Sequence, residues 1–150
     1  MRKYFLIGMY VAGALFFNTV SAQDMNQSQV PSIVVNNFQQ QFSKAYDIEW
    51  EKEVAYYKVE FELGANGRDH EVWYDAKGNM VKHKEEISKG ELPKAVHTKI
   101  GSEFSGHRID DTKKITEGSK VIYSVELKSA ASEWKVLFDK DGNVISKLPD

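Results

Sequence analysis

The feature that most constrains this chain is an internal repeat, in which three segments of the first half recur in the same order in the second half. The matched segments are VPSIV at 30 with LPKAV at 92, YKVEF at 57 with YSVEL at 123, and VWYDAKGN at 72 with VLFDKDGN at 136. Their offsets are 62, 66 and 64 residues, and the differences fall between the segments, where loops tolerate changes in length. We therefore divide the domain, residues 30–150, into repeat one (30–90) and repeat two (91–150).

Each repeat begins with a helix pattern. Pro31 and Pro93 suit the first helical turn, where the missing N–H of proline costs no hydrogen bond. Apolar residues then recur every four positions, which places one apolar stripe on each helix. These residues are Val34, Phe38 and Phe42 in repeat one, and Val96, Ile100 and Phe104 in repeat two.

Strand patterns follow each helix. Residues 57–63 and 123–128 alternate apolar with polar side chains, which is typical of a half-buried antiparallel strand. Asn66-Gly67 favours a tight hairpin turn, and the segments 75–79 and 139–143 have the Asp and Gly of type I turns. We predict an α+β fold in which two tandem helix-plus-four-stranded antiparallel units form one roughly eight-stranded sheet, with both helices on one face.

The N-terminus has the pattern of an export signal. Arg2 and Lys3 precede an apolar run at 5–17, which is shorter than the roughly 20 residues of a membrane-spanning helix. Val20-Ser21-Ala22 then presents small residues for signal peptidase. We predict a signal peptide at 1–22, a flexible tail at 23–29, and a periplasmic or secreted product without membrane attachment; an uncleaved anchor is the alternative.

Charge and cysteine content exclude several classes of function. The formal net charge is −2, and removal of Arg2 and Lys3 makes it −4, which disfavours nucleic-acid binding. The chain has no cysteine, so thiol catalysis, thiolate metal sites and disulfides are excluded. Stability must therefore come from a hydrophobic core.

The LP helix start, the YxVEF strand and the FDxxGN turn, each used twice, resemble the PepSY-like family, related in architecture to the beta-lactamase inhibitor protein. The resemblance covers residues 30–146. It implies binding of a protein or peptide on the helix-free face of the sheet. The inhibitor protein carries disulfides, which this chain lacks, and no interface residue transfers from it, so inhibition of a beta-lactamase is not predicted.

Strand alternation predicts which side chains occupy the helix-free face. Large apolar side chains among charged ones are typical of the centre of a protein interface. Alternatively, they are cross-strand pairs that simply stabilise a two-sided sheet. The predicted binding residues are Tyr56, Trp73, Ile122 and Leu137, with Lys58 and Lys135 as charged neighbours.

Patterns for catalysis, metals and cofactors are weak. His70 and His83 could approach across neighbouring strands, but without a His-x-His pair we interpret the histidines as solvated. The turn at 139–143 begins like a calcium loop, but its glycine comes too early and no glutamate closes the loop. We predict no metal, no cofactor and no enzymatic activity.

The predicted function is therefore an exported, non-catalytic binding module, such as an inhibitor or regulator of an envelope or secreted enzyme. Its partner is a protein or peptide of the envelope, whose identity the sequence does not give, and the oligomeric state is equally open. The alternatives are a periplasmic carrier of a small ligand and a hydrolase that uses paired carboxylates such as Glu60 and Glu62.

Overall fold

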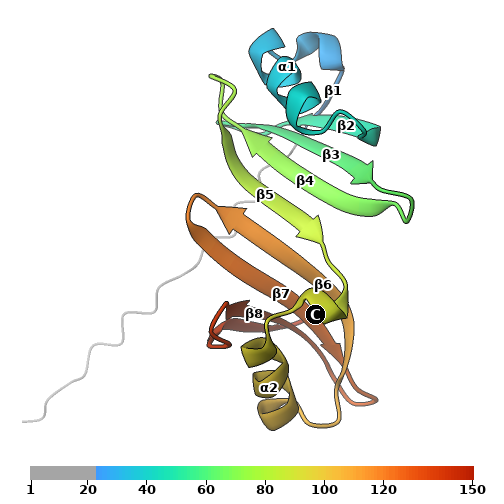
Figure 1. The fold of residues 1–150 in the computed structure, drawn as a ribbon, viewed down its shortest axis with the longest axis vertical. Coiled ribbons are helices and arrows are strands. Elements are labelled where there is room, and N and C mark those ends of the chain that lie inside the picture. The colour runs from blue at the N-terminus through green and yellow to red at the C-terminus, as the bar shows by residue number, and fades with distance from the viewer. Residues whose placement is uncertain (1–22) are drawn as a thin grey trace, which may run out of the picture.

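A computed structural model describes residues 23–150, so the predicted signal peptide lies outside the described residues. Within these residues, nine antiparallel strands form one sheet in which each strand pairs with the next along the chain (Figure 1). Unit one comprises β1 (Gln23–Met25), η1 (Gln27–Gln29), α1 (Ser32–Gln41), β2 (Tyr46–Lys52), β3 (Tyr57–Leu63), β4 (Arg68–Tyr74) and β5 (Met80–Glu86). Unit two comprises η2 (Lys89–Glu91), α2 (Lys94–Glu103), β6 (Arg108–Glu117), β7 (Lys120–Lys128), β8 (Glu133–Asp139) and β9 (Val144–Pro149).

Both helices cover the same face of the sheet, which confirms the predicted fold class. Val72 lies opposite His83, His83 opposite Thr116, and Thr116 opposite Val121. Residues directly opposite one another project from the same face, so these four side chains share one face. Val125 lies four positions beyond Val121 on β7, and because side chains alternate between faces it projects from that face too. Val72 packs in the cluster under α1 and Val125 in the cluster under α2. The two helices lie at opposite ends of the long axis (Figure 1).

The core is divided into two apolar clusters that share no residue. Where the units join, β5 and β6 pair through largely polar residues, among them His83 with Thr116 and Glu85 with Lys114. The buried residues of unit one are Val30, Val34, Phe38, Trp50, Val59, Phe61, Val72 and Tyr74. Those under α2 are Ile87, Leu92, Val96, Ile100, Phe104, Val125, Leu127, Val136 and Phe138.

The Asp-x-x-Gly-Asn turns have the same hydrogen bonds in both units. Oδ1 of Asp75 accepts from the backbone N–H of Lys77 at 2.8 Å and of Asn79 at 2.9 Å, and its Oδ2 accepts from the Asn79 side chain at 2.9 Å. Asp139 makes the equivalent bonds with Asp141 and Asn143. The hydrogen bonds from asparagine lower the pKa of both aspartates. Both aspartates are thus engaged by their own turns.

The predicted flexible tail at 23–29 is wrong. Gln23, Asp24 and Met25 form an edge strand opposite Lys52, Glu51 and Trp50 of β2, and η1 follows directly. The side chain of Met25 packs against the core cluster of unit one. One apolar contact and the backbone ladder therefore order a segment whose composition is polar.

Glu91 ties the start of unit two to β4 of unit one, and its contribution to stability should depend on pH. Its carboxylate accepts hydrogen bonds from the N–H and hydroxyl of Ser88 at 2.8 and 2.7 Å and forms an ion pair with Arg68 at 2.9 Å. These contacts, led by the backbone bond from Ser88, lower the pKa of Glu91 from 4.5 to about 2.

Because this pKa is lowered on folding, the stabilisation is complete above pH 4.5 and is lost as the pH falls toward 2. We expect Glu91→Gln, which keeps a hydrogen-bond acceptor, to lower the melting temperature at neutral pH. The difference from wild type should shrink as the pH falls toward 2 and vanish below it. Thermal unfolding of both proteins, followed by circular dichroism across this pH range, tests the prediction. A difference in melting temperature that does not change with pH would contradict it.

Candidate functional site

The face of the sheet opposite the helices, called the open face below, carries Trp73 in a fixed position. Trp73 of β4 lies opposite Lys58 of β3 and Lys82 of β5. The ammonium of Lys82 is 4.5 Å from the centroid of the indole ring, and that of Lys58 is 5.7 Å away. Both distances are within the range of cation–π attraction. The half-buried indole is therefore held between two lysines while part of its surface faces solvent.

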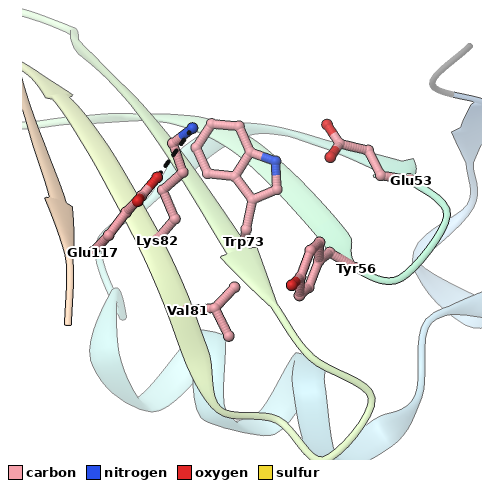
Figure 2. Close-up of a pocket in the computed structure, with 6 residues that line it drawn as sticks. All are labelled: Glu53, Tyr56, Trp73, Val81, Lys82 and Glu117. Atoms are coloured by element: carbon pink, nitrogen blue, oxygen red, sulfur yellow. Dashed lines mark ion pairs between the residues drawn. The ribbon is translucent and has the colours of Figure 1, made fainter. Parts of the chain in front are cut away.

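Tyr56 and Trp73, two of the predicted binding residues, line one hollow (Figure 2). Tyr56 directly precedes β3 and is 40% exposed. The hollow has a volume of about 320 Å³. Its other lining residues are Glu53, Val81, Lys82 and Glu117, and these six residues are called the aromatic hollow below. An ion pair of 3.6 Å between Lys82 and Glu117 closes one side of it.

Four residues of the aromatic hollow were not predicted from the sequence. A shift in register leaves Val81 without a partner, because Trp73 pairs with Lys82 and Tyr74 pairs with Met80. Such a bulge can turn a side chain toward the face that simple alternation would not give it. Glu117 comes from the other unit, across the β5–β6 junction, and Glu53 from the loop after β2. Neither placement follows from the pattern of a single repeat.

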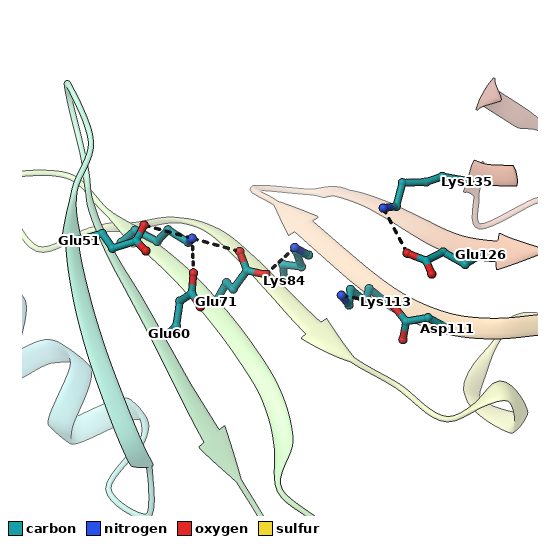
Figure 3. Close-up of polar contacts among 9 residues, drawn as sticks. Glu51, Glu60, Glu71, Lys84, Asp111, Lys113, Glu126 and Lys135 are labelled. Carbon is teal, nitrogen blue, oxygen red and sulfur yellow. Dashed lines mark hydrogen bonds and ion pairs between the residues drawn. The ribbon is translucent and has the colours of Figure 1, made fainter. Parts of the chain in front are cut away.

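Lys58, predicted as a charged contact, lies within a cluster of carboxylates. It forms ion pairs with Glu60, with Glu51 at 3.3 Å and with Glu71 at 3.6 Å, and its side chain is 13% exposed. Burial acts to lower the pKa of Lys58, but the carboxylates outweigh it and the pKa lies above its usual value. The side chains of Glu51, Glu60 and Glu71 come from three neighbouring strands and converge on this one ammonium group (Figure 3). Lys58 thus fixes the carboxylates and is little exposed to a partner.

Carboxylates outnumber lysines on the open face of unit one. Burial acts to raise the pKa of Glu71, but its contacts with Lys84 and Lys58 lower it below the usual value, so the group stays ionised. The strand registers place Glu49, Glu51, Glu60, Glu62, Asp69, Glu71 and Glu86 on this face, against Lys58, Lys82 and Lys84. This face therefore has a negative charge beside the aromatic hollow.

Ile122, Leu137 and Lys135 lie on the open face of unit two, apart from the aromatic hollow. Ile122 of β7 is opposite Ile115 of β6, and Leu137 of β8 is opposite Ser124. Lys135 forms ion pairs with Glu126 at 3.2 Å and with Asp150 at 3.6 Å. The predicted residues are therefore brought together in two groups, of which only that of unit one lines the aromatic hollow.

The interpretation of the histidines as solvated is wrong for two of them. His70 is 8% exposed, and its Nδ1 lies 3.0 Å from Nε2 of His83. The imidazole of His70 stacks on the ring of Phe61, with the centroids 5.2 Å apart, and meets the imidazole of His83 edge to edge, with the centroids 5.3 Å apart. Burial lowers the pKa of both histidines. Pairing of β4 with β5 brings together two histidines that are 13 residues apart in sequence.

Within residues 23–150, no helix combines the length and the hydrophobicity needed to cross a bilayer.

Comparison with known proteins identifies a family and a fold. The model of the family described as "Putative beta-lactamase-inhibitor-like, PepSY-like" matches residues 18–82 and, in a second overlapping match, residues 55–146. No curated protein matches the chain.

Three solved structures from Bacteroides illustrate the likeness in fold. A "putative periplasmic" protein of Bacteroides eggerthii is 22% identical, with 80% of this chain and 88% of that chain covered and a TM-score of 0.70. A DUF2874 family protein of Bacteroides uniformis is 23% identical, with 79% and 88% covered and a TM-score of 0.69. A BLIP-like protein of Bacteroides fragilis is 22% identical, with 79% and 84% covered and a TM-score of 0.63.

Proposed function

Because the chain belongs to the PepSY-like family of beta-lactamase-inhibitor-like proteins, we propose that it is a non-catalytic module that binds a protein or peptide on the open face of unit one. The observation that carries this proposal is the aromatic hollow. Tyrosine and tryptophan are enriched where interfaces gain most of their free energy, since they bury a large apolar area and keep a polar group at the edge.

The geometry of the hollow suits a docking surface. Trp73 is held by Lys58 and Lys82, so it loses little conformational freedom when a partner covers it. The rim is polar, with Glu53 and the Lys82–Glu117 ion pair around the rings. An apolar centre with a charged rim is the arrangement of specific protein interfaces. A stabilising cross-strand pair alone would not require Tyr56, which lies outside the strands.

The charge of this face indicates the chemistry of the partner. Carboxylates such as Glu49, Glu62 and Asp69 lie on the same open face, farther along β2, β3 and β4 from the hollow, and form no ion pair with a lysine within residues 23–150. Opposite charge across an interface steers association and selects partners. We infer a partner segment that combines an apolar or aromatic side chain with lysine or arginine, and its association rate should fall as salt is added.

One likeness in fold and one prediction from the sequence support a periplasmic role of this kind. The likeness in fold includes a "BLIP-like" protein of Bacteroides fragilis and a "putative periplasmic" protein of Bacteroides eggerthii. The predicted signal peptide at 1–22 would deliver the chain to the same compartment. Regulation of an envelope enzyme fits this location.

The alternative functions receive less support. The space between the helices and the sheet is filled by the two apolar clusters, which leaves little room for a carried ligand. A hydrolase that uses two carboxylates needs one with a raised pKa. Within residues 23–150, every carboxyl group whose pKa is displaced has a lowered pKa. These groups are Glu71, Asp75, Glu91, Asp110 and Asp139.

Affinity capture from an envelope extract tests the proposal. Wild-type protein should retain a specific partner, and the double variant Trp73→Ala, Tyr56→Ala should lose it. Truncation of a central aromatic anchor costs at least about 2 kcal/mol, which is about 30-fold in affinity. The matched control is Leu137→Ala with Ile122→Ala, at the repeat-equivalent positions of unit two.

The control should capture the partner as well as wild type does, and circular dichroism should show that both variants are folded. Equal capture by a folded Trp73→Ala, Tyr56→Ala variant would contradict the proposed site. Loss of capture in the unit-two control alone would place the site on the other half of the open face.

A further inference from the structure

Two imidazoles and a carboxylate converge on the helix-covered face where unit one meets unit two. His70 Nδ1 is 3.0 Å from His83 Nε2, and one carboxylate oxygen of Glu85 completes a group whose ligand atoms all lie within 4.8 Å of one another. Glu85 lies directly opposite His70 across β4 and β5, and His83 is two residues before it on the same strand. All three side chains therefore project from one face of two paired strands.

The donors match the preference of one class of metal ion. Two neutral imidazole nitrogens with one carboxylate form a donor set that suits first-row transition ions, of which zinc is the one that needs only four ligands, whereas calcium and magnesium need six or more oxygens. Two nitrogens on one tetrahedral Zn²⁺ lie about 3.3 Å apart when each bond is about 2.05 Å long. The separation of 3.0 Å between the two nitrogens therefore needs an opening of a few tenths of an ångström, together with a turn of the two rings that directs both lone pairs at the ion.

The protonation state also favours a metal ion. Burial lowers the pKa of His70 and of His83, so both rings are neutral at neutral pH and have a lone pair to offer. In the metal-free protein the two facing nitrogens share one N–H as a hydrogen bond. A shift of that proton to the ring's other nitrogen leaves both facing nitrogens free to coordinate.

A path from solvent reaches the group. A surface hollow of about 220 Å³ is lined by His83 and Glu85 and also by Lys114 and Thr116 of unit two. Lys114 forms an ion pair of 2.9 Å with Oε1 of Glu85. Phe42 and Phe61 pack against the rings from the other side and hold them in place. The group is thus supported by aromatic packing and open on one side.

From this arrangement we propose that His70, His83 and Glu85 form a binding site for one Zn²⁺ ion, with water at the remaining position. The site lies on the face opposite the aromatic hollow and is independent of the proposed protein-binding function. The sequence allows the two histidines to approach across neighbouring strands, but their spacing of 13 residues matches no metal-binding motif, so it does not indicate this site.

Isothermal titration of ZnCl₂ into chelator-treated protein, residues 23–150, tests this site. Wild type should bind one Zn²⁺ per chain. His83→Gln and Glu85→Gln should each weaken binding at least about tenfold, since loss of even an outer-shell partner costs about 10–100-fold. His97→Gln is the matched control, because His97 is exposed on α2 and should leave binding unchanged.

A second measurement remains informative if His83→Gln does not fold. Nitrogen-15 NMR of the wild-type imidazoles should show Zn²⁺ shifting Nδ1 of His70 and Nε2 of His83 and leaving His97 and His107 in place. The proposal is overturned if wild type binds no Zn²⁺, if His97→Gln loses as much affinity as Glu85→Gln, or if the imidazole shifts occur at the other histidines.

Discussion

Replacing Phe38 with alanine should destabilise unit one by about 3–5 kcal/mol and leave unit two near its wild-type stability. Phe38 is 1% exposed, and its ring lies between those of Trp50 at 5.4 Å and Phe61 at 5.0 Å, with Phe42 at 5.8 Å. Truncation removes these contacts and leaves a cavity that three rigid rings cannot fill by small shifts.

The effect should stay within unit one because the two apolar clusters share no residue. The junction between β5 and β6 consists of strand pairing and polar contacts such as the Glu85–Lys114 ion pair. Native-state hydrogen exchange, read residue by residue by NMR, should show loss of protection in β3 and β4 and its retention in β7 and β8.

Phe138→Ala provides the reciprocal control. Phe138 is fully buried in the cluster under α2, so its loss should weaken β7 and β8 and spare β3 and β4. Equal loss of protection in both units for either variant would mean that the sheet unfolds as one cooperative body, contrary to the division of the core.

Gly142→Ala should destabilise unit two by about 2–5 kcal/mol, the sum of about 1–2 for a left-handed backbone and about 1–3 for overpacking. Gly142 has φ of 82°, which disfavours any residue with a Cβ. A Cβ at this position would lie 2.5 Å from the carbonyl oxygen of Ala95 in α2. The turn after β8 therefore packs against the first turns of the helix through the glycine itself.

Gly118→Ala separates the two contributions. Gly118 also has a left-handed backbone, with φ of 56°, but a Cβ there would meet no atom within 4 Å. It should therefore cost only the backbone part, about 1–2 kcal/mol. Urea unfolding of both variants measures the difference, and equal losses of stability would show that close packing on Ala95 contributes nothing.

The repeat made most of the fold predictable. Apolar spacing from Val34 and from Val96 gave the helices, and strand alternation gave the open face on which Trp73 and Leu137 lie. Such patterns are local and have a fixed period, so they can be read without knowledge of the tertiary contacts. The same alternation predicts that Tyr56 and Trp73 lie on one face, and these two residues are the part of the candidate site that strand alternation can predict.

The features that sequence reasoning missed depend on pairing between distant segments. The strand at 23–25 exists because it finds the edge of β2, and Val81 reaches the aromatic hollow through a shift in register between β4 and β5. The approach of His70 and His83 was expected, but their burial was not, because it depends on how β4 and β5 align them. Glu117 arrives from the other unit. Register is a tertiary property, so composition and periodicity do not give it.

The most direct test of the open-face site is NMR of the indole N–H groups during titration with the captured partner. The chain has three tryptophans, Trp50 in the core of unit one, Trp73 in the aromatic hollow, and Trp134, whose indole N–H donates to Ser132 at 3.1 Å. We expect the Trp73 resonance to shift strongly while those of Trp50 and Trp134 stay in place. A bound complex in which Trp73 does not shift would contradict it.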